Sequence, residues 1–158
     1  MPTPFPFPLS TGVDICHVAR IKRLLHRHPN FVKKVLVPQE IYALEHKKSS
    51  DQASITEGDG IQKSHSAQYL AGRWAAKEAI MKAHTKRRLT MQDIWIKSAT
   101  NGAPTAWIKA RLVESGVSMS AKSAGEREEA LWRDATEARI SITHDGEYAV
   151  ATCLAVDE

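Results

Sequence analysis

The chain has 158 residues, of which 42% are hydrophobic and 25% charged, and its formal net charge is +4. This is the size and balance of one globular domain, and no apolar run has the length of a membrane-spanning helix. The two cysteines, Cys16 and Cys153, lie far apart, which argues against a disulfide framework or a thiolate zinc site and favours a reducing compartment. A modest basic excess favours anionic partners: nucleic acid, phosphorylated metabolites or an acidic protein.

The first third of the chain predicts one strand and several short helices. Residues 9–15 have the pattern of a short strand and follow a proline-rich, extended arm. Apolar side chains at helical spacing predict a helix near 18–27. Pro29 restarts the chain into 31–36, and Pro38 suits the first residue of another short helix.

The middle of the chain predicts a polar loop and then its strongest helix. Residues 46–66 are polar, contain Gly and Ser and have no period, which is typical of a flexible loop or insertion. Residues 66–84 are rich in Ala, Leu, Met, Glu and Lys, with only Gly72 as an interruption, and predict a long helix. Strands are expected at 93–96 and 105–108 around the turn Asn101-Gly102.

The last third predicts a surface segment and a hairpin. A helix near 110–114 is plausible, and the polar stretch 115–137 could hold a surface helix. Residues 139–144 and 148–156 alternate in polarity and are joined at Asp145-Gly146, a strong hairpin signal. The chain therefore predicts one α+β domain over residues 1–158, with an antiparallel sheet packed on a long central helix and polar insertions near 46–66 and 115–137.

Acidic and basic side chains at helical spacing suggest a phosphate-binding metal site. Asp14 follows Gly12 in the first strand, where a glycine lets another backbone or a ligand come close. Glu78 and Lys82 project from one face of the long helix, and Arg73 and Lys77 form a basic pair on an adjacent stripe. A carboxylate ringed by three cations would suit magnesium beside phosphates. The plainer alternatives are a helix-capping Asp and a surface Glu–Lys pair.

His144 ends the first strand of the hairpin, where it could bind a phosphate or carry a proton. A lone histidine is more often a hydrogen-bonded structural residue. Neither His144 nor the acidic residues decide the function individually.

Taken in order, three segments resemble the signatures of holo-acyl-carrier-protein synthases, a family of 4′-phosphopantetheinyl transferases. They are GVDICHVARI, WAAKEAIMKA and ISITHDGEYAVA. The resemblance extends through FVKKVLVPQEI and DIWIKSATNGAPTAWI, and so covers most of the chain outside the N-terminal arm and the two polar segments. Thr85 to Arg88 stand where many members have a glycine-rich stretch, and the polar insertions look closest to fungal stand-alone members.

The resemblance implies a magnesium-dependent transfer of 4′-phosphopantetheine from coenzyme A to a serine of an apo acyl carrier protein, in fatty acid and lipid metabolism. Asp14 and Glu78 match the metal ligands, which together with Lys82 are the expected catalytic residues. Magnesium binds to few carboxylates and completes its octahedron with phosphate and water oxygens. The general base is either Glu78 or a water beside it. The residues expected to contact coenzyme A are Arg73, Lys82, His144, Lys86 and Arg87.

The resemblance also implies partners. Arg20, Arg23 and Arg27 are expected to meet acidic side chains of the carrier protein. Small members of the family form trimers with active sites between subunits, which implies a homotrimer here. Similarity to fungal members implies a mitochondrial location, although the N-terminus has no recognisable secretory or transit signal, and the cytoplasm is the alternative.

Two other functions compete with the transferase. One is an inactive homologue that binds a carrier protein without transferring anything. The other is a basic nucleic-acid-binding domain, which the Arg/Lys clusters at 20–27 and 82–88 and four tryptophans would suit. That reading leaves Asp14 and Glu78 without a role. Neither membrane nor nucleic acid is an expected partner of the transferase.

Overall fold

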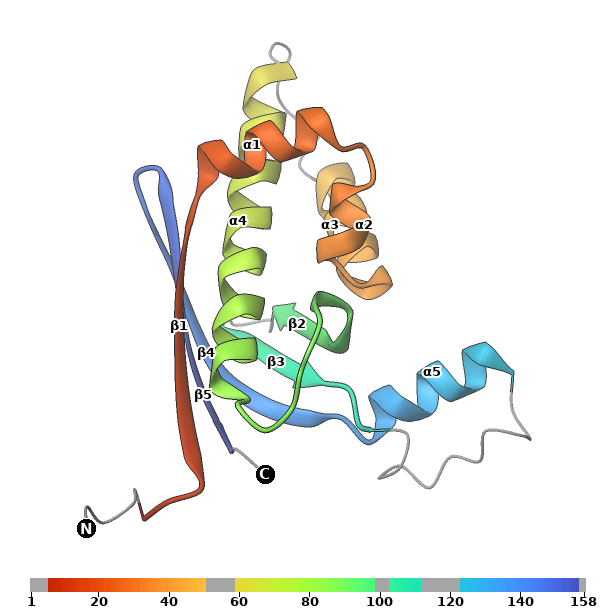
Figure 1. Cartoon of the computed structure of the whole chain (residues 1–158). Coiled ribbons are helices and arrows are strands. Elements are labelled where there is room, and N and C mark those ends of the chain that lie inside the picture. Colours follow the sequence, from red (N-terminus) through yellow and green to blue (C-terminus); the bar gives the residue numbers. More distant parts are fainter. Residues whose placement is uncertain (1–5, 51–58, 99–102, 112–122, 157–158) are drawn as a thin grey trace.

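A long helix crossing an antiparallel sheet organises the structure (Figure 1). The computed structural model describes residues 6–50, 59–98, 103–111 and 123–156, with the side chains of 46–50, 59–65, Ala124 and Arg127 excepted. The elements in chain order are β1 (Leu9–His17), α1 (Val18–Arg27), α2 (Phe31–Val35), α3 (Pro38–Ser50), α4 (Asp59–Ala83), the 3₁₀ helix η2 (Met91–Asp93), β2 (Ile94–Ser98), β3 (Pro104–Ile108), α5 (Ala124–Arg133), β4 (Thr136–Asp145) and β5 (Tyr148–Val156).

The sheet has the strand order β1-β5-β4-β3-β2, so the first strand pairs with the last. All four pairings are antiparallel. Gly146 has a φ of +54° in the β4–β5 turn, a conformation that favours glycine and fits the hairpin predicted from Asp145-Gly146. The α+β class and the packing of the antiparallel sheet on a central helix are confirmed.

Helix α4 packs mainly on β1 and β5, and the buried residues at this contact are small. We call the contact the small-residue interface. On the strands it consists of Gly12, Cys16, Ala149, Ala151, Cys153 and Ala155, and on the helix of Ala71, Ala75, Ala76, Ala79 and Ala83. Small side chains let a helix backbone approach a sheet closely, because fewer atoms fill the space between them.

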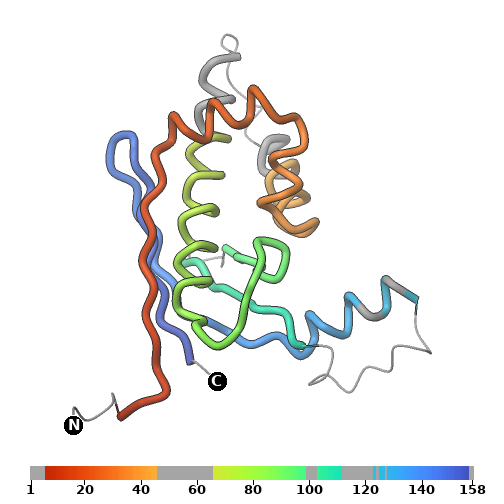
Figure 2. Tube along the Cα trace, in the orientation of Figure 1, coloured from red at the N-terminus to blue at the C-terminus, as the bar shows by residue number. Residues whose placement is uncertain are grey.

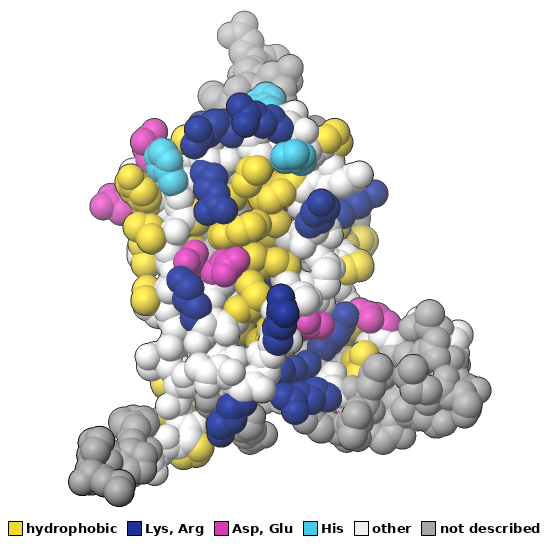
Figure 3. Space-filling view, viewed as in Figure 1, with side chains coloured by type: hydrophobic (Ala, Val, Ile, Leu, Met, Phe, Trp, Pro, Cys, Tyr) yellow, Lys and Arg dark blue, Asp and Glu magenta, His cyan; other side chains and the backbone are white. Residues whose placement is uncertain are grey.

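Helices α1, α2 and α3 lie on the other side of α4 (Figure 2). Ile21 of α1 and Phe31 and Val35 of α2 are buried in the core cluster that includes α4. The opposite side of α1 is basic, and Lys and Arg side chains gather over this helix in the space-filling view (Figure 3). The amphipathic pattern predicted near 18–27 is therefore confirmed, with its apolar stripe facing α4.

Several boundaries differ from those expected. Helix α3 continues to Ser50 and α4 begins at Asp59, so the segment predicted as a loop at 46–66 is helical at both ends, while 51–58 lie outside the described residues. The sequences of α3 and α4 are only weakly amphipathic, so their apolar pattern did not predict the helical turns at 46–50 and 59–65. Residues 110 and 111 are not helical, and the rest of the helix expected at 110–114 lies outside the described residues. The surface helix expected within 115–137 is α5, and β4 already begins at Thr136.

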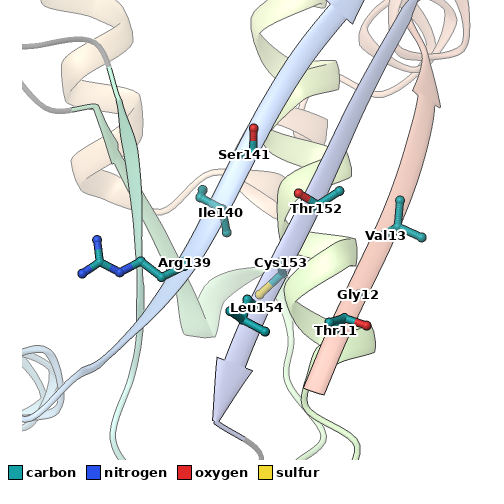
Figure 4. Close-up of a pocket in the computed structure, with 9 residues that line it drawn as sticks. All are labelled: Thr11, Gly12, Val13, Arg139, Ile140, Ser141, Thr152, Cys153 and Leu154. Carbon is teal, nitrogen blue, oxygen red and sulfur yellow. The ribbon is translucent and has the colours of Figure 1, made fainter. Parts of the chain in front are cut away.

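The outer face of β1 and β5, which points away from α4, is exposed and largely apolar. Val13 and Ile15 are 59% and 60% exposed. Its other large exposed side chains are Leu9, Tyr148, Leu154 and Val156. A shallow pocket on this face runs across β1, β5 and β4, with Val13, Thr152 and Ser141 in one row (Figure 4).

Among the described residues, no helix combines the length and the apolar character that crossing a membrane requires.

The two cysteines give a probe of this packing. Burial raises the pKa of both the Cys16 and the Cys153 thiol to about 11. Since the thiolate is the reactive form, a thiol with this pKa has about a hundredfold less thiolate at pH 8 than an ordinary one. We expect neither thiol to be alkylated by iodoacetamide in the native protein within the time that labels free cysteine, and both to be alkylated in urea. Rapid native labelling, measured by intact mass, would contradict the packing of α4 on β1 and β5.

Candidate active site

An ion pair between β1 and α4 lies at the centre of the candidate site. Asp14 is on the inner side of β1, two residues after Gly12, and its side chain is 16% exposed. The Lys82 ammonium donates to Asp14 Oδ1 over 2.8 Å and to the carbonyl oxygen of Val13 over 3.1 Å. The hydrogen bond with Asp14 raises the pKa of Lys82, so this lysine is charged near neutral pH.

Glu78 is on α4, one turn before Lys82, and is close to the same pair. Its charge, with that of Asp14, further raises the pKa of Lys82, and both charges add to the effect of burial on the thiol of Cys16. Because α4 places residues four apart on one face, Glu78 and Lys82 project together toward β1. The structure therefore brings together Asp14, Glu78 and Lys82, as the sequence predicts.

The donor set fits a magnesium ion that binds few protein ligands. The carboxylates of Asp14 and Glu78, from different elements, converge on the single cation Lys82. Together the three groups carry a net negative charge, which a metal cation would offset. No cluster of three or more His, Cys, Asp or Glu side chains suited to a metal is present within the described ranges. Magnesium, unlike zinc, commonly uses one or two carboxylates and takes its other ligands from phosphate and water.

The expected ring of three cations around Glu78 is wrong, because two of its members point elsewhere. Lys77 is fully buried, and Arg73 is 6% exposed. Lys77 donates to Glu40 over 2.6 Å, while Arg73 donates to Ser98 over 3.0 Å and lies over the ring of Tyr69. Residues 73 and 77 are one turn apart and share a helix stripe that faces α3 and β2, whereas Glu78 lies 100° further around the helix.

Glu40 is an important residue that the sequence analysis missed. Its carboxylate is buried and accepts hydrogen bonds from the backbone N–H of Val37 and of Ile96 as well as from Lys77. The sequence could have indicated the backbone contact of Glu40, because a Glu two residues after a helix-starting Pro can accept a hydrogen bond from the N-cap backbone N–H. It could not have indicated the contact with Lys77, 37 residues later, because only the tertiary structure brings the two side chains together.

His144 lies against α4 at Gly72. Its Nε2 is 3.2 Å from the carbonyl oxygen of Gln68, which can only accept, so Nε2 carries the proton. A Cβ on residue 72 would come within 2.9 Å of this nitrogen, so the His144 ring would have to shift to admit a larger residue there. Glu78 is six positions after Gly72, about 9 Å along the helix axis. His144 and the Asp14 pair thus lie along the same helix, on the side that faces the sheet.

The comparisons with known proteins decide the family. Residues 10–155 match the model of the 4′-phosphopantetheinyl transferase superfamily. The chain belongs to this superfamily. It is 32% identical to "4′-phosphopantetheinyl transferase B, mitochondrial" of Aspergillus fumigatus, over 96% of each chain. It is 33% identical to the holo-[acyl-carrier-protein] synthase of Geobacillus kaustophilus, over 89% of this chain and 82% of that one.

A solved structure has the same fold. The acyl carrier protein synthase of Plasmodium yoelii with ADP bound has a TM-score of 0.66 and 27% identity, covering 94% of this chain and 95% of that one. The resemblance drawn from the three sequence motifs is thus confirmed. In the superfamily chain described here, two of those motifs supply Asp14 on β1 and Glu78 and Lys82 on α4, and the third supplies His144.

The remaining predicted residues lie on opposite sides of the acidic pair along α4. Lys86 and Arg87 are in the turn that follows this helix, exposed and partly exposed respectively. Arg20, Arg23 and Arg27 are exposed on α1, which crosses α4 nearer its other end (Figure 2). The guanidinium of Arg20 lies 5.3 Å from the ring centroid of Trp74 on α4. The basic residues therefore form two separate groups, one on each side of the acidic pair along the helix.

Gly12 determines how close Asp14 comes to α4 in this transferase fold. A Cβ at residue 12 would lie 1.9 Å from the Ala79 carbonyl oxygen, a backbone atom that cannot rotate away. We expect Gly12→Ala to destabilise the protein by about 1–3 kcal/mol and to lower activity at least tenfold, because Asp14 moves with β1. Thermal unfolding and steady-state kinetics measure the two effects.

The matched control is Gly125→Ala. Residue 125 is in α5, and a Cβ there meets no atom within 4 Å. Alanine is the better helix former, so this variant should be as stable as the parent or more so. If Gly12→Ala and Gly125→Ala had the same thermal stability and the same activity, the role given to Gly12 would be contradicted.

Proposed function

We propose that the protein is a holo-acyl-carrier-protein synthase, which transfers 4′-phosphopantetheine from coenzyme A to a serine of an apo acyl carrier protein. The observation that carries the proposal is the convergence of Asp14, Glu78 and Lys82 between β1 and α4. Superfamily membership and the two relatives, one named a 4′-phosphopantetheinyl transferase and one a holo-[acyl-carrier-protein] synthase, support the reaction class.

The reaction exchanges one phosphorus–oxygen bond for another. The serine oxygen bonds to the phosphorus that carries pantetheine, and the bond from that phosphorus to the bridging oxygen breaks. The products are the phosphopantetheinyl carrier and adenosine 3′,5′-bisphosphate, and the serine proton is released. Glu78, or a water beside it, accepts this proton. Lys82 holds positive charge where negative charge grows on the leaving phosphate.

Asp14 and Glu78 are the proposed magnesium ligands. When bound, the ion would supply charge neutralisation to the pyrophosphate. Asp14 also orients Lys82 through their 2.8 Å contact. Since Asp14 is on a central part of β1 and Lys82 on a long helix, both groups are held before substrate arrives, as electrostatic catalysis requires.

Coenzyme A is the proposed donor, with contacts from Lys82, Lys86, Arg87, His144 and Arg73. The ADP in the Plasmodium yoelii structure supports an adenosine phosphate site in this fold. Because His144 Nε2 donates to Gln68, the ring can donate to a phosphate through Nδ1 only as an imidazolium. Arg73 is held by Ser98 in the isolated chain, so its contact with coenzyme A requires the cofactor to approach beside Ser98.

An apo acyl carrier protein is the proposed acceptor, and its acidic side chains would meet Arg20, Arg23 and Arg27 on α1. These side chains are exposed on α1, and Lys and Arg side chains gather over this helix in Figure 3. Complementary charge speeds the encounter of two proteins more than it strengthens the final complex.

A homotrimer is the proposed assembly, formed through the outer face of β1, β5 and β4. Exposed Val13, Ile15 and Leu154 make this face apolar. Extended apolar surfaces on a soluble domain usually mark an interface. The pocket across these strands would then be covered by a neighbouring copy (Figure 4).

The mitochondrion is the proposed location, with the cytoplasm as the alternative. Its support is the name of the Aspergillus fumigatus relative, which matches over 96% of this chain.

Intact mass of an apo acyl carrier protein tests the transfer directly. After incubation with coenzyme A, magnesium and this protein, we expect a gain of one phosphopantetheine, and none when EDTA is added. Glu78→Gln keeps the shape of the side chain but removes its charge, and should lower the rate at least a hundredfold, about the contribution of a positioned base or ligand. Glu129→Gln removes an exposed carboxylate on α5 and serves as the control.

The competing functions give different results in this assay. An inactive carrier-binding homologue would retain the carrier protein on a column without changing its mass. A nucleic-acid-binding domain would retain oligonucleotides rather than coenzyme A.

The assembly is tested by substituting two exposed residues of β1. Val13→Asp with Ile15→Asp places charges on the outer face, and burying them between copies is costly. We expect the parent to elute at about three times the 17.5 kDa chain mass and the double variant at the mass of one chain. Tyr42→Asp, a change at a 63% exposed residue on α3, should leave the assembly intact. A monomeric parent at micromolar concentration would contradict the trimer.

A further inference from the structure

Lys77 is the most constrained charged residue among the described residues of α4. Its side chain has no exposed surface, and its ammonium has three acceptors. These are Glu40 Oε2 at 2.6 Å, the Val35 carbonyl at 2.7 Å and the Met91 carbonyl at 3.0 Å. A lysine has three N–H donors, so all of them are used and none is left for a phosphate or a carboxylate of a substrate.

The three acceptors of Lys77 come from three different segments. Val35 ends α2, Glu40 is in the first turn of α3, and Met91 begins η2. The Lys77 side chain therefore joins α2 and α3 to η2, the short helix that leads into β2. Burial lowers the pKa of Lys77, and the charge of Glu40 opposes this effect.

The bond to Met91 determines where the basic turn after α4 ends. This turn, residues 84–90, contains Lys86 and Arg87. At its start, the N–H of His84 donates to the carbonyl of Ile80, within the last turn of the helix. At its other end, Lys77 holds Met91. The turn is thus fixed at both ends to α4, and Lys77 provides the second attachment.

A second side chain strengthens the same junction. Gln92 Nε2 lies within 3.1–3.2 Å of the carbonyl oxygens of Lys33, Lys34 and Leu36 at the end of α2. The N–H and hydroxyl of Thr90 both donate to Asp93, which closes η2. Movement of Met91 would therefore also disturb the end of α2, and through it the position of α1.

We infer that Lys77 is a positioning residue, which aligns the basic turn at 84–90 and the helices α1 and α2 with Glu78 and Lys82 on α4. This inference rests on the proposed function for its consequence, since Lys86 and Arg87 are the proposed coenzyme A contacts. The lysine next to Glu78 acts through the segments that it binds, because all three of its donors are used by Val35, Glu40 and Met91.

Two variants separate positioning from stability. Lys77→Met removes all three bonds and leaves the Glu40 carboxylate buried with Arg73 at 3.8 Å as its remaining cation. The double variant Lys77→Met with Glu40→Gln removes that charge too, and Gln still offers an oxygen to a backbone N–H. Breaking a buried pair is costly mainly because a charge is left behind, so the double variant should recover much of the lost stability. In both variants Met91 and Val35 have lost their donor.

We expect both variants to have a KM for coenzyme A raised roughly tenfold, less than the roughly hundredfold cost of a 1 Å misplacement. Amide hydrogen exchange in residues 84–93 should be at least tenfold faster than in the parent, and unchanged in α5. The control is Lys109→Met, which removes another largely buried lysine from a 2.6 Å ion pair, with Glu128. It should lower stability without changing the KM or exchange at 84–93.

A double variant with the KM and the exchange rates of the parent would overturn the inference, since Lys77 would then only stabilise the fold. If Lys77→Met does not fold, the double variant decides. If the parent transfers nothing to several carrier proteins, the proposed function has failed. In that case exchange at 84–93, which needs no turnover, still decides the role of Lys77: faster exchange in the double variant supports it, and unchanged exchange overturns it.

Discussion

The close contact of α4 with β1 and β5 is the constraint on which the rest of the structure depends. The small-residue interface brings two backbones so near that residue 12 has no room for a methyl group. This distance allows a carboxylate on a strand and a lysine on a helix, 68 residues apart in sequence, to meet at 2.8 Å. With larger residues at the interface, Asp14 and Lys82 would be separated by the extra thickness of the core. The proposed catalytic geometry therefore depends on small residues that take no part in the proposed reaction.

Helix α4 contacts different partners on different sides. One side packs on the sheet and carries Glu78 and Lys82 beside β1. Another side binds α3 through Lys77 and Arg73, and Lys77 also binds the end of α2 and the start of η2. Along its length, His144 lies near one end of this arrangement and the turn with Lys86 and Arg87 at the other. A single rigid element thus supports the proposed metal ligands and the proposed contacts to both substrates, which is how a site is kept in place before binding.

The sequence predicted the parts of this arrangement that are local or carried by family motifs. The hairpin at Asp145-Gly146, the long helix, the first strand and the convergence of Asp14, Glu78 and Lys82 are of this kind. Glycine 12 was also interpreted correctly as a point of close approach. The direction of Arg73 and Lys77 was not predictable, because helical spacing alone shows that two residues share a stripe but not which neighbour the stripe faces. The neighbour that this stripe faces is Glu40 on α3, a helix to which the sequence analysis gave no role.

The polar segments illustrate a different difficulty. Residues near 46–50 and 59–66 lack an apolar period, and the periodicity that reveals a buried helix face was therefore missing. A helix can continue from a formed turn by propagation even where its sequence has no apolar period. The boundaries of such a helix are therefore the part of the fold that composition describes least well.

The buried pair of Glu40 and Lys77 also has a consequence for how such proteins diverge. A change at either position alone leaves a charge in an apolar interior, whereas a simultaneous change to neutral residues removes both charges at once. The two positions should therefore be kept or changed together, although they are 37 residues apart and lie on different helices. A chimera that takes α3 from one relative and α4 from another would inherit this dependence, and its parents should be chosen to match at both positions.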